Sequence, residues 1–212
     1  ENTMKAFKNV SVYAEGKGII RTSVYFDDKI RQIGGYVAGA EEIELPENAV
    51  VLPGFIDEHI HGAGGSDAMD GNTKDLAIIA ETVAKEGTTS FLATTMTQSK
   101  ENILKAMRAV KEYREAAGEQ GARIAGVHLE GPFIAAAHKG AQPLEYVAAP
   151  DAKTFDEYNA ACGNAIKIIT LAPETDGALV EKWEKVQFLR GLVSKALEAE
   201  RAAGKIGQAL EA

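Results

Sequence analysis

The stretch Pro53-Gly54-Phe55-Ile56-Asp57-Glu58-His59-Ile60-His61-Gly62 joins an apolar run to two histidines that are one residue apart. Together with Val50-Val51-Leu52 before it, the run predicts a strand buried on both faces, as in a parallel sheet. Side chains alternate along a strand, so His59 and His61 point to the same side. Two imidazoles at the carboxyl end of a strand can reach one divalent ion, which predicts a metal site.

The residues that follow alternate between strand and helix patterns. Such alternation predicts parallel strands joined by right-handed crossovers. Four strand–helix units are half of an eight-fold barrel, and a complete barrel takes about 250 residues. The expected elements after the first strand are a helix at 75–86 with apolar Leu76, Ile79, Ala80 and Val83; a strand at 88–96; a helix capped by Ser99 with apolar Ile103, Leu104, Met107 and Val110; a strand at 123–129; a helix at 155–162; and a strand at 165–171.

The two ends of the chain do not follow this alternation. Residues 1–50 hold short β-rich runs between turn signals, which predicts a small antiparallel, β-sandwich-like module. Residues 183–212 place Val186, Leu189, Val193 and Leu197 at helical spacing, which predicts an amphipathic helix. The fold class is therefore α/β: a small β module, the truncated first half of a TIM-type (β/α)8 barrel at 51–182, and an extra C-terminal helix.

Composition argues against several classes of partner. The formal net charge of −8 over 212 residues does not favour a broad nucleic-acid-binding surface. The single cysteine, Cys162, cannot form an internal disulfide, so a reducing compartment is the simple interpretation. No apolar run reaches membrane-spanning length, and no signal-type segment opens the chain. We therefore expect a cytoplasmic protein with neither a nucleic-acid nor a membrane partner.

A second constellation lies in Val127-His128-Leu129-Glu130-Gly131-Pro132. Glu130 ends the third strand of the alternating series, on the same rim as the histidine pair, so its oxygens can bind the same ion. His128 shares the face of Glu130 one layer deeper, and we interpret it as a buried residue rather than a ligand. Mixed nitrogen and oxygen ligands suit zinc or iron among the divalent metals.

The loop after this strand contains Lys139-Gly140-Ala141-Gln142-Pro143. Its backbone N–H groups and its amide side chain could hold a polar ligand at the rim. A plain surface loop explains these residues equally well.

These segments, with Thr-Thr-Ser-Phe-Leu-Ala-Thr at 88–94 and Thr-Leu-Ala-Pro-Glu at 170–174, stand in the order seen in N-acetylglucosamine-6-phosphate deacetylases. Over about residues 4–182 the chain resembles this family of amidohydrolases. The resemblance implies metal-dependent hydrolysis of N-acetylglucosamine 6-phosphate, an amino-sugar phosphate, to glucosamine 6-phosphate and acetate, by a homodimer. It implies that Glu130 is the principal ligand, that His59 and His61 hold a second ion, and that Ala141 and Gln142 contact the substrate.

The resemblance also implies groups that this sequence lacks. Family members take two more metal-binding histidines and a catalytic Asp from later strands, whereas the histidines here are 59, 61, 128 and 138. We therefore expect the catalytic Asp to lie in a missing half and this chain to be inactive by itself. A catalytically dead half-barrel or fusion that acts as a self-associating interaction module is the alternative.

The segment 183–212 is similar to a helix near the C-terminal region of isoleucyl-tRNA synthetases. It could be a tRNA-binding tail, but its five basic and four acidic residues give a net charge of only +1. That charge is too small for an independent tRNA binder.

Overall fold

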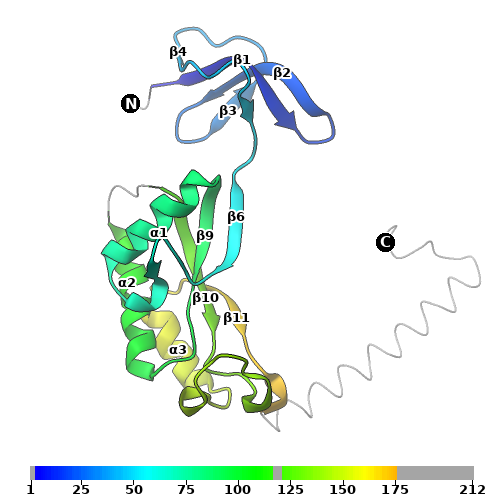
Figure 1. Ribbon diagram of the computed structural model, residues 1–212. Coiled ribbons are helices and arrows are strands. Elements are labelled where there is room, and N and C mark those ends of the chain that lie inside the picture. Colours follow the sequence, from blue (N-terminus) through cyan, green and yellow to red (C-terminus); the bar gives the residue numbers. More distant parts are fainter. Residues whose placement is uncertain (1–2, 117–120, 176–212) are drawn as a thin grey trace, which may run out of the picture. The chain divides into compact units, whose positions relative to one another are not determined.

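The computed structural model of the protein describes residues 3–116 and 121–175 (Figure 1). Internal contacts divide the chain into two compact units, Glu1–Phe55 and Ile56–Ala212. The division follows Phe55, whereas the sequence pattern changes after residue 50. The helix expected at 183–212 lies outside the described residues.

The first unit is built on a five-stranded sheet. Strands β1 (Lys5–Ala14), β2 (Gly18–Phe26) and β3 (Ile30–Ile33) pair antiparallel, as predicted, while β4 (Glu41–Glu42) and β5 (Val50–Val51) both pair parallel to β1. The expectation of an antiparallel module was therefore wrong for β4 and β5. The strand order is β3-β2-β1-β4, so the chain crosses from the β3 edge of the sheet to the β1 side. After this crossover β4 runs parallel to β1.

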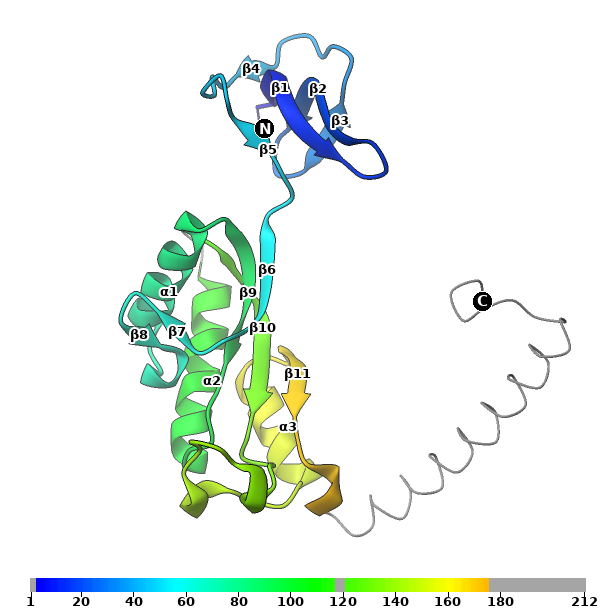
Figure 2. The ribbon, with the colours of Figure 1, turned by 45° about the vertical axis from the view of Figure 1, so that its right-hand side comes forward.

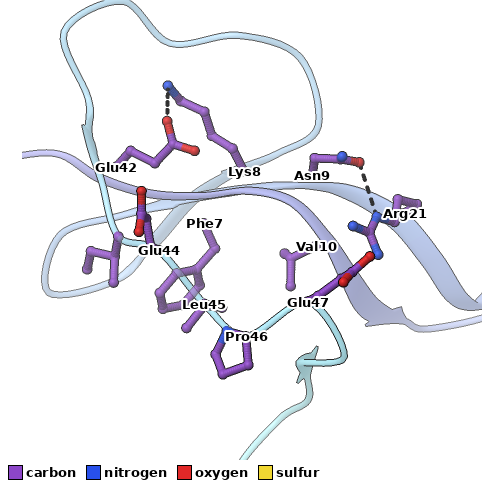
Figure 3. A pocket seen from close by; sticks show the side chains of 11 residues that line it. Phe7, Lys8, Asn9, Val10, Arg21, Glu42, Glu44, Leu45, Pro46 and Glu47 are labelled. Carbon is purple, nitrogen blue, oxygen red and sulfur yellow. Dashed lines mark hydrogen bonds and ion pairs between the residues drawn. The ribbon is translucent and has the colours of Figure 1, made fainter.

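A pocket of about 370 Å³ opens beside β1 in this unit, next to the segment 43–47 that connects β4 to β5 (Figure 3). The ammonium of Lys8 lies 2.9 Å from a carboxylate oxygen of Glu42, and the Arg21 guanidinium donates to Asn9 Oδ1 at 3.1 Å. Both cations that line the pocket therefore already have partners within the unit.

The second unit confirms the predicted α/β half-barrel. Strands β6 (Phe55–Ile60), β9 (Thr88–Thr94), β10 (Arg123–Glu130) and β11 (Ile166–Thr170) form a sheet in the order β11-β10-β9-β6, with β10 parallel to both neighbours. Helices α1 (Thr73–Lys85), α2 (Lys100–Glu115) and α3 (Ala152–Ala161) connect the strands and lie together on one side of the sheet (Figures 1 and 2). The short elements are β7 (Gly62–Ala63), β8 (Ser66–Asp67), and the 3₁₀ turns η1 (Ala68–Asp70), η2 (Ala136–His138), η3 (Leu144–Tyr146) and η4 (Pro173–Thr175).

The apolar run that begins at Val50 does not form one buried strand, as the sequence predicted. It is split into β5 and β6, which belong to different sheets. Pro53 has no N–H group and Gly54 has no side chain to pack, so neither favours a continuous ladder. Phe55 and Ile56 are 65% and 70% exposed, because β6 is an edge strand in the described part of its sheet.

The helices pack as predicted, but α1 and α3 begin two and three residues earlier than expected, at Thr73 and Ala152. In α1 the four expected positions, Leu76, Ile79, Ala80 and Val83, are the buried ones. Ser99 caps α2 by accepting a hydrogen bond from the Asn102 N–H at 3.3 Å. Of the four expected apolar positions of α2, Ile103, Met107 and Val110 are buried, whereas Leu104 is partly buried and packs against the core. Side chains with a 3.6-residue period thus press one face of each helix against the sheet.

The core of this unit lies between the helices and the sheet and includes Phe91, Met107, Ile124 and Leu129. Cys162 is fully buried within it, and burial raises the pKa of its thiol. This agrees with its interpretation as a small apolar residue. Within the described residues, no helix is long and apolar enough to cross a membrane.

Candidate metal centre

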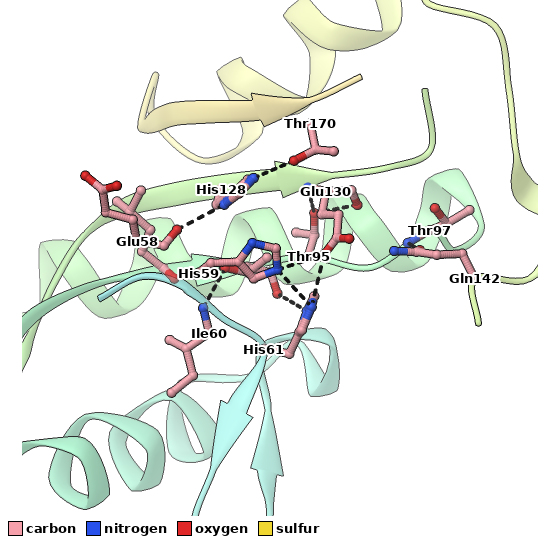
Figure 4. Close-up of polar contacts among 12 residues, drawn as sticks. Glu58, His59, Ile60, His61, Thr95, Thr97, His128, Glu130, Gln142 and Thr170 are labelled. Carbon is pink, nitrogen blue, oxygen red and sulfur yellow. Dashed lines mark hydrogen bonds and ion pairs between the residues drawn. The ribbon is translucent and has the colours of Figure 1, made fainter. Parts of the chain in front are cut away.

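The predicted site residues meet on the face of the sheet opposite the helices (Figure 4). Along β6, Ile60 packs against the helix-side core, so His59 and His61 point to the other face. Along β10, Leu129 belongs to the same core, and His128 and Glu130 point away from it. Alternation on two separate strands therefore brings both histidines and the carboxylate to one place.

Three donor atoms converge there. Oε2 of Glu130 lies 3.1 Å from Nε2 of His59 and 3.0 Å from Nε2 of His61, and the two Nε2 atoms are 3.4 Å apart. A tetrahedral ion with bonds of about 2.05 Å has ligands about 3.3 Å from one another, so the spacing fits a small divalent metal ion. In the described parts of the chain, these three residues are the one group with metal-ligand spacing.

The pattern of possible hydrogen bonds also favours a cation. The ring nitrogens cannot both donate to Glu130 and also accept from one another, so protons alone do not satisfy all three contacts. The Nδ1 atom of His61 lies 3.3 Å from the carbonyl oxygen of Thr94. Since a carbonyl only accepts, Nδ1 carries the hydrogen and Nε2 of the neutral ring keeps a lone pair for the ion.

Neighbouring polar groups fix the backbone of the site. The N–H of His59 donates to Asp57 Oδ1 at 3.0 Å, and the N–H of Ile60 donates to Thr94 Oγ1 at 3.0 Å. The N–H of Glu130 donates to Thr95 Oγ1 at 3.2 Å. Sequence reasoning missed these two threonines, although a run of hydroxyl residues at the end of a buried strand could have indicated them.

His128 is buried, as predicted, with 6% of its surface exposed. Both of its ring nitrogens have protein partners, the Glu58 carbonyl at 3.0 Å and Thr170 Oγ1 at 2.8 Å. It therefore has no free nitrogen for a metal ion.

The two predicted substrate-binding residues differ in environment. Ala141 is exposed, and Gln142 is 7% exposed with its Oε1 accepting from the Thr97 N–H at 2.7 Å. Gln142 thus anchors its loop to the chain just after β9, a role that the sequence did not reveal. Contact of either residue with a substrate stays a prediction.

A parallel half-barrel with a His-x-His pair and a glutamate at the carboxyl ends of its strands defines the class of metal-dependent hydrolase barrels. The model of the amidohydrolase family matches residues 50–206. The chain therefore belongs to the amidohydrolase family.

Known relatives are similar over part of their length. The chain is 45% identical over 139 residues to N-acetylglucosamine-6-phosphate deacetylase from Bacillus subtilis, covering 65% of this chain and 35% of that protein. It is 31% identical over 189 residues to N-acetylgalactosamine-6-phosphate deacetylase from Escherichia coli O157:H7, covering 85% of this chain and 50% of that protein. The chain spans about a third to a half of the length of these relatives.

A solved structure has a similar fold. N-acetylglucosamine-6-phosphate deacetylase from Pasteurella multocida superposes with a TM-score of 0.70 at 30% identity, covering 84% of this chain and 48% of that one. The chain thus matches about half of that structure.

Proposed function

We propose that this chain carries the metal-binding part of an enzyme that hydrolyses the acetamide of N-acetylglucosamine 6-phosphate to glucosamine 6-phosphate and acetate. The observation that carries the proposal is the convergence of Glu130 Oε2 on both Nε2 atoms of His59 and His61. The names of the relatives support the substrate, and the higher identity to the glucosamine enzyme favours it over the galactosamine sugar.

Zinc or iron suits a site of two imidazoles and one carboxylate. When bound, such an ion polarises the amide carbonyl and lowers the pKa of a water molecule. His59, His61 and Glu130 would hold it, and three protein ligands leave room for water or substrate. Glu130 offsets part of the positive charge, and the Thr94 carbonyl fixes the ring of His61.

Substrate contact is proposed for the loop that carries Ala141 and Gln142. The hydrogen bond from the Thr97 N–H to Gln142 Oε1 ties this loop to the segment just after β9. Thr95, in the same segment, accepts a hydrogen bond from the N–H of Glu130 through its Oγ1. A loop held in this way can place backbone donors near the sugar while it stays in register with the metal ligands.

We propose that these 212 residues by themselves turn over very little substrate. Hydrolysis needs a base that takes a proton from water and returns it to the leaving amine, and such a base contributes at least about 100-fold. In the described parts of the chain, Glu130 is the one carboxylate in the cluster, and its contacts assign it to the metal.

Self-association is the second candidate property. A pocket of about 400 Å³ lies at the β11 edge of the sheet, and its lining includes the apolar side chains of Phe133, Phe155, Ile169 and Leu171. In the described part of the chain β11 is an edge strand, and an edge beside apolar side chains favours contact with another chain. Analytical ultracentrifugation of the protein tests this; a monomer at all concentrations would oppose it.

A chimera tests the catalytic proposal. Residues 4–175 replace the matching part of the Bacillus subtilis deacetylase, and acetate release from N-acetylglucosamine 6-phosphate is measured with zinc or iron. We expect activity that the Glu130→Gln chimera lacks, and negligible activity from the 212-residue chain. A folded, metal-loaded chimera that releases no acetate would refute the function, and a preference for N-acetylgalactosamine 6-phosphate would correct the substrate.

A further inference from the structure

The ring of His128 joins three strands of the sheet. It belongs to β10, its Nδ1 lies 3.0 Å from the carbonyl oxygen of Glu58 in β6, and its Nε2 lies 2.8 Å from Oγ1 of Thr170 in β11 (Figure 4). Among the described residues the sheet order is β11-β10-β9-β6, so β6 and β11 are the two outermost strands there and do not pair with each other. The side chain therefore links the two strands at opposite ends of this strand order.

The partners of His128 determine which nitrogen of the neutral ring carries the hydrogen. The Glu58 carbonyl can only accept, so Nδ1 carries the hydrogen and donates it. Nε2 then has a lone pair, which accepts the hydrogen of the Thr170 hydroxyl. Both nitrogens are thereby occupied, and the ring is fixed against rotation about its side-chain bonds.

This fixed ring supports His59 in two ways. The Glu58 carbonyl belongs to the peptide that links Glu58 to His59, so His128 holds the backbone next to the ligand. The two imidazoles also meet edge to face, with centroids 4.6 Å apart and planes at 74°. The side chain of His59 is 49% exposed, and the contact with His128 adds to those with Glu130 and His61 in holding it in place.

We propose that His128 is a positioning residue for the metal centre, which sets the metal affinity and coordination geometry by holding His59 and the end of β6 against β10 and β11. The inference rests on the proposed metal site. It differs from a purely structural role, in which removing a buried histidine would lower stability and leave the coordination unchanged.

Cobalt(II) is the probe, because its visible absorption reports the geometry of its ligands. Titrations of the whole chain compare the wild type with His128→Phe, which keeps a ring and removes both hydrogen bonds, and with His128→Asn, which keeps a donor near the Glu58 carbonyl. We expect His128→Phe to weaken Co²⁺ binding about 10- to 100-fold and to change the spectrum, as loss of a group behind a ligand does. His128→Asn should recover part of the affinity.

Substitutions of Thr170 supply an independent test, because they change the volume of the side chain very little. Thr170→Val should weaken Co²⁺ binding by several-fold and alter the spectrum, whereas Thr170→Ser keeps the hydroxyl and should restore both. This pair decides the proposal if His128→Phe fails to fold. Val83→Ala, in the core contact of α1, is the matched control that lowers the unfolding temperature without changing the spectrum.

The outcomes separate the two proposals. If the wild type binds no Co²⁺, the metal site fails, and the positioning role fails with it. The other outcome is that the wild type binds Co²⁺ and that both His128→Phe and Thr170→Val have the same affinity and spectrum as the wild type. The metal site then stands, and the positioning role of His128 is overturned.

Discussion

Nε2 of His59 lies 3.1 Å from Oε2 of Glu130, although 71 residues separate the two in the chain. The contact exists because β6 and β10 end at the same edge of a parallel sheet, with β9 between them. Two strands that do not pair can thus bring side chains to one place when the sheet curves as in a barrel. The predicted metal binding therefore depends on the sheet being assembled.

Replacing Glu130 by Gln tests the carboxylate as a ligand. The substitution keeps the shape and removes the negative charge beside both imidazoles, so we expect zinc affinity to fall by at least about 100-fold, more than for loss of a group behind a ligand. Equilibrium dialysis with elemental analysis measures it. Glu58→Gln is the matched control, because it changes the same charge on an exposed residue of β6. Equal affinities for the two variants would remove Glu130 from the site.

Gly131 follows Glu130 at a φ of +66°, and a Cβ there would lie 2.0 Å from Thr97 Oγ1. Gly131→Ala therefore adds a steric conflict to the cost of a left-handed residue, which is about 1–2 kcal/mol. Gly140→Ala is the control, because Gly140 has a φ of +60° with open space around it. We expect urea unfolding to show a clearly larger loss of stability for Gly131→Ala. Equal losses would mean that the Thr97 side chain can move away from the added Cβ without a loss of stability.

The pKa of Asp75 is lowered from its ordinary value of 3.8 by hydrogen bonds from the Ser66 hydroxyl and the Asn72 amide. A carboxyl whose pKa is lower in the folded state stabilises the fold above the unfolded value and loses this effect as the pH falls through the folded one. Asp75→Asn should therefore be less stable than the wild type at neutral pH, and the difference should shrink as the pH falls below 3.8. Urea unfolding at several pH values measures it.

The control for Asp75 is Glu81→Gln, which removes the same charge from an exposed position of α1. Its stability difference from the wild type should change less with pH. A difference for Asp75→Asn that is constant from neutral pH down to about pH 3 would contradict the role of the two hydrogen bonds.

Much of the second unit could be predicted from periodicity, because the helices bury one face each. Leu76, Ile79, Ala80 and Val83 formed such a face, and the cap at Ser99 was visible in the sequence. The division of the run from Val50 was not predicted, because hydrophobicity does not say which sheet a strand joins. The parallel pairing of β4 and β5 depends on a crossover between distant segments, which local patterns do not encode.

The meeting of the three candidate ligands could be predicted from the sequence, whereas the groups that support them could not. His59, His61 and Glu130 end strands and point one way, which alternation alone indicates. The partners of His128 are a carbonyl 70 residues away and a hydroxyl 42 residues away. Such pairs depend on strand register, and the bulge between Val127 and His128 shifts that register in a way that the sequence does not show.

Zinc should stabilise the protein, since an ion that binds three groups brought together by folding favours the folded state. At a free concentration 100 times its Kd, the gain is about 2.7 kcal/mol. The unfolding temperature of the wild type should therefore rise when zinc is added. That of a His59→Ala, His61→Ala double variant should not. His138→Ala, which changes an exposed histidine outside the cluster, should respond like the wild type. A zinc-dependent rise that persists in the double variant would place the ion elsewhere.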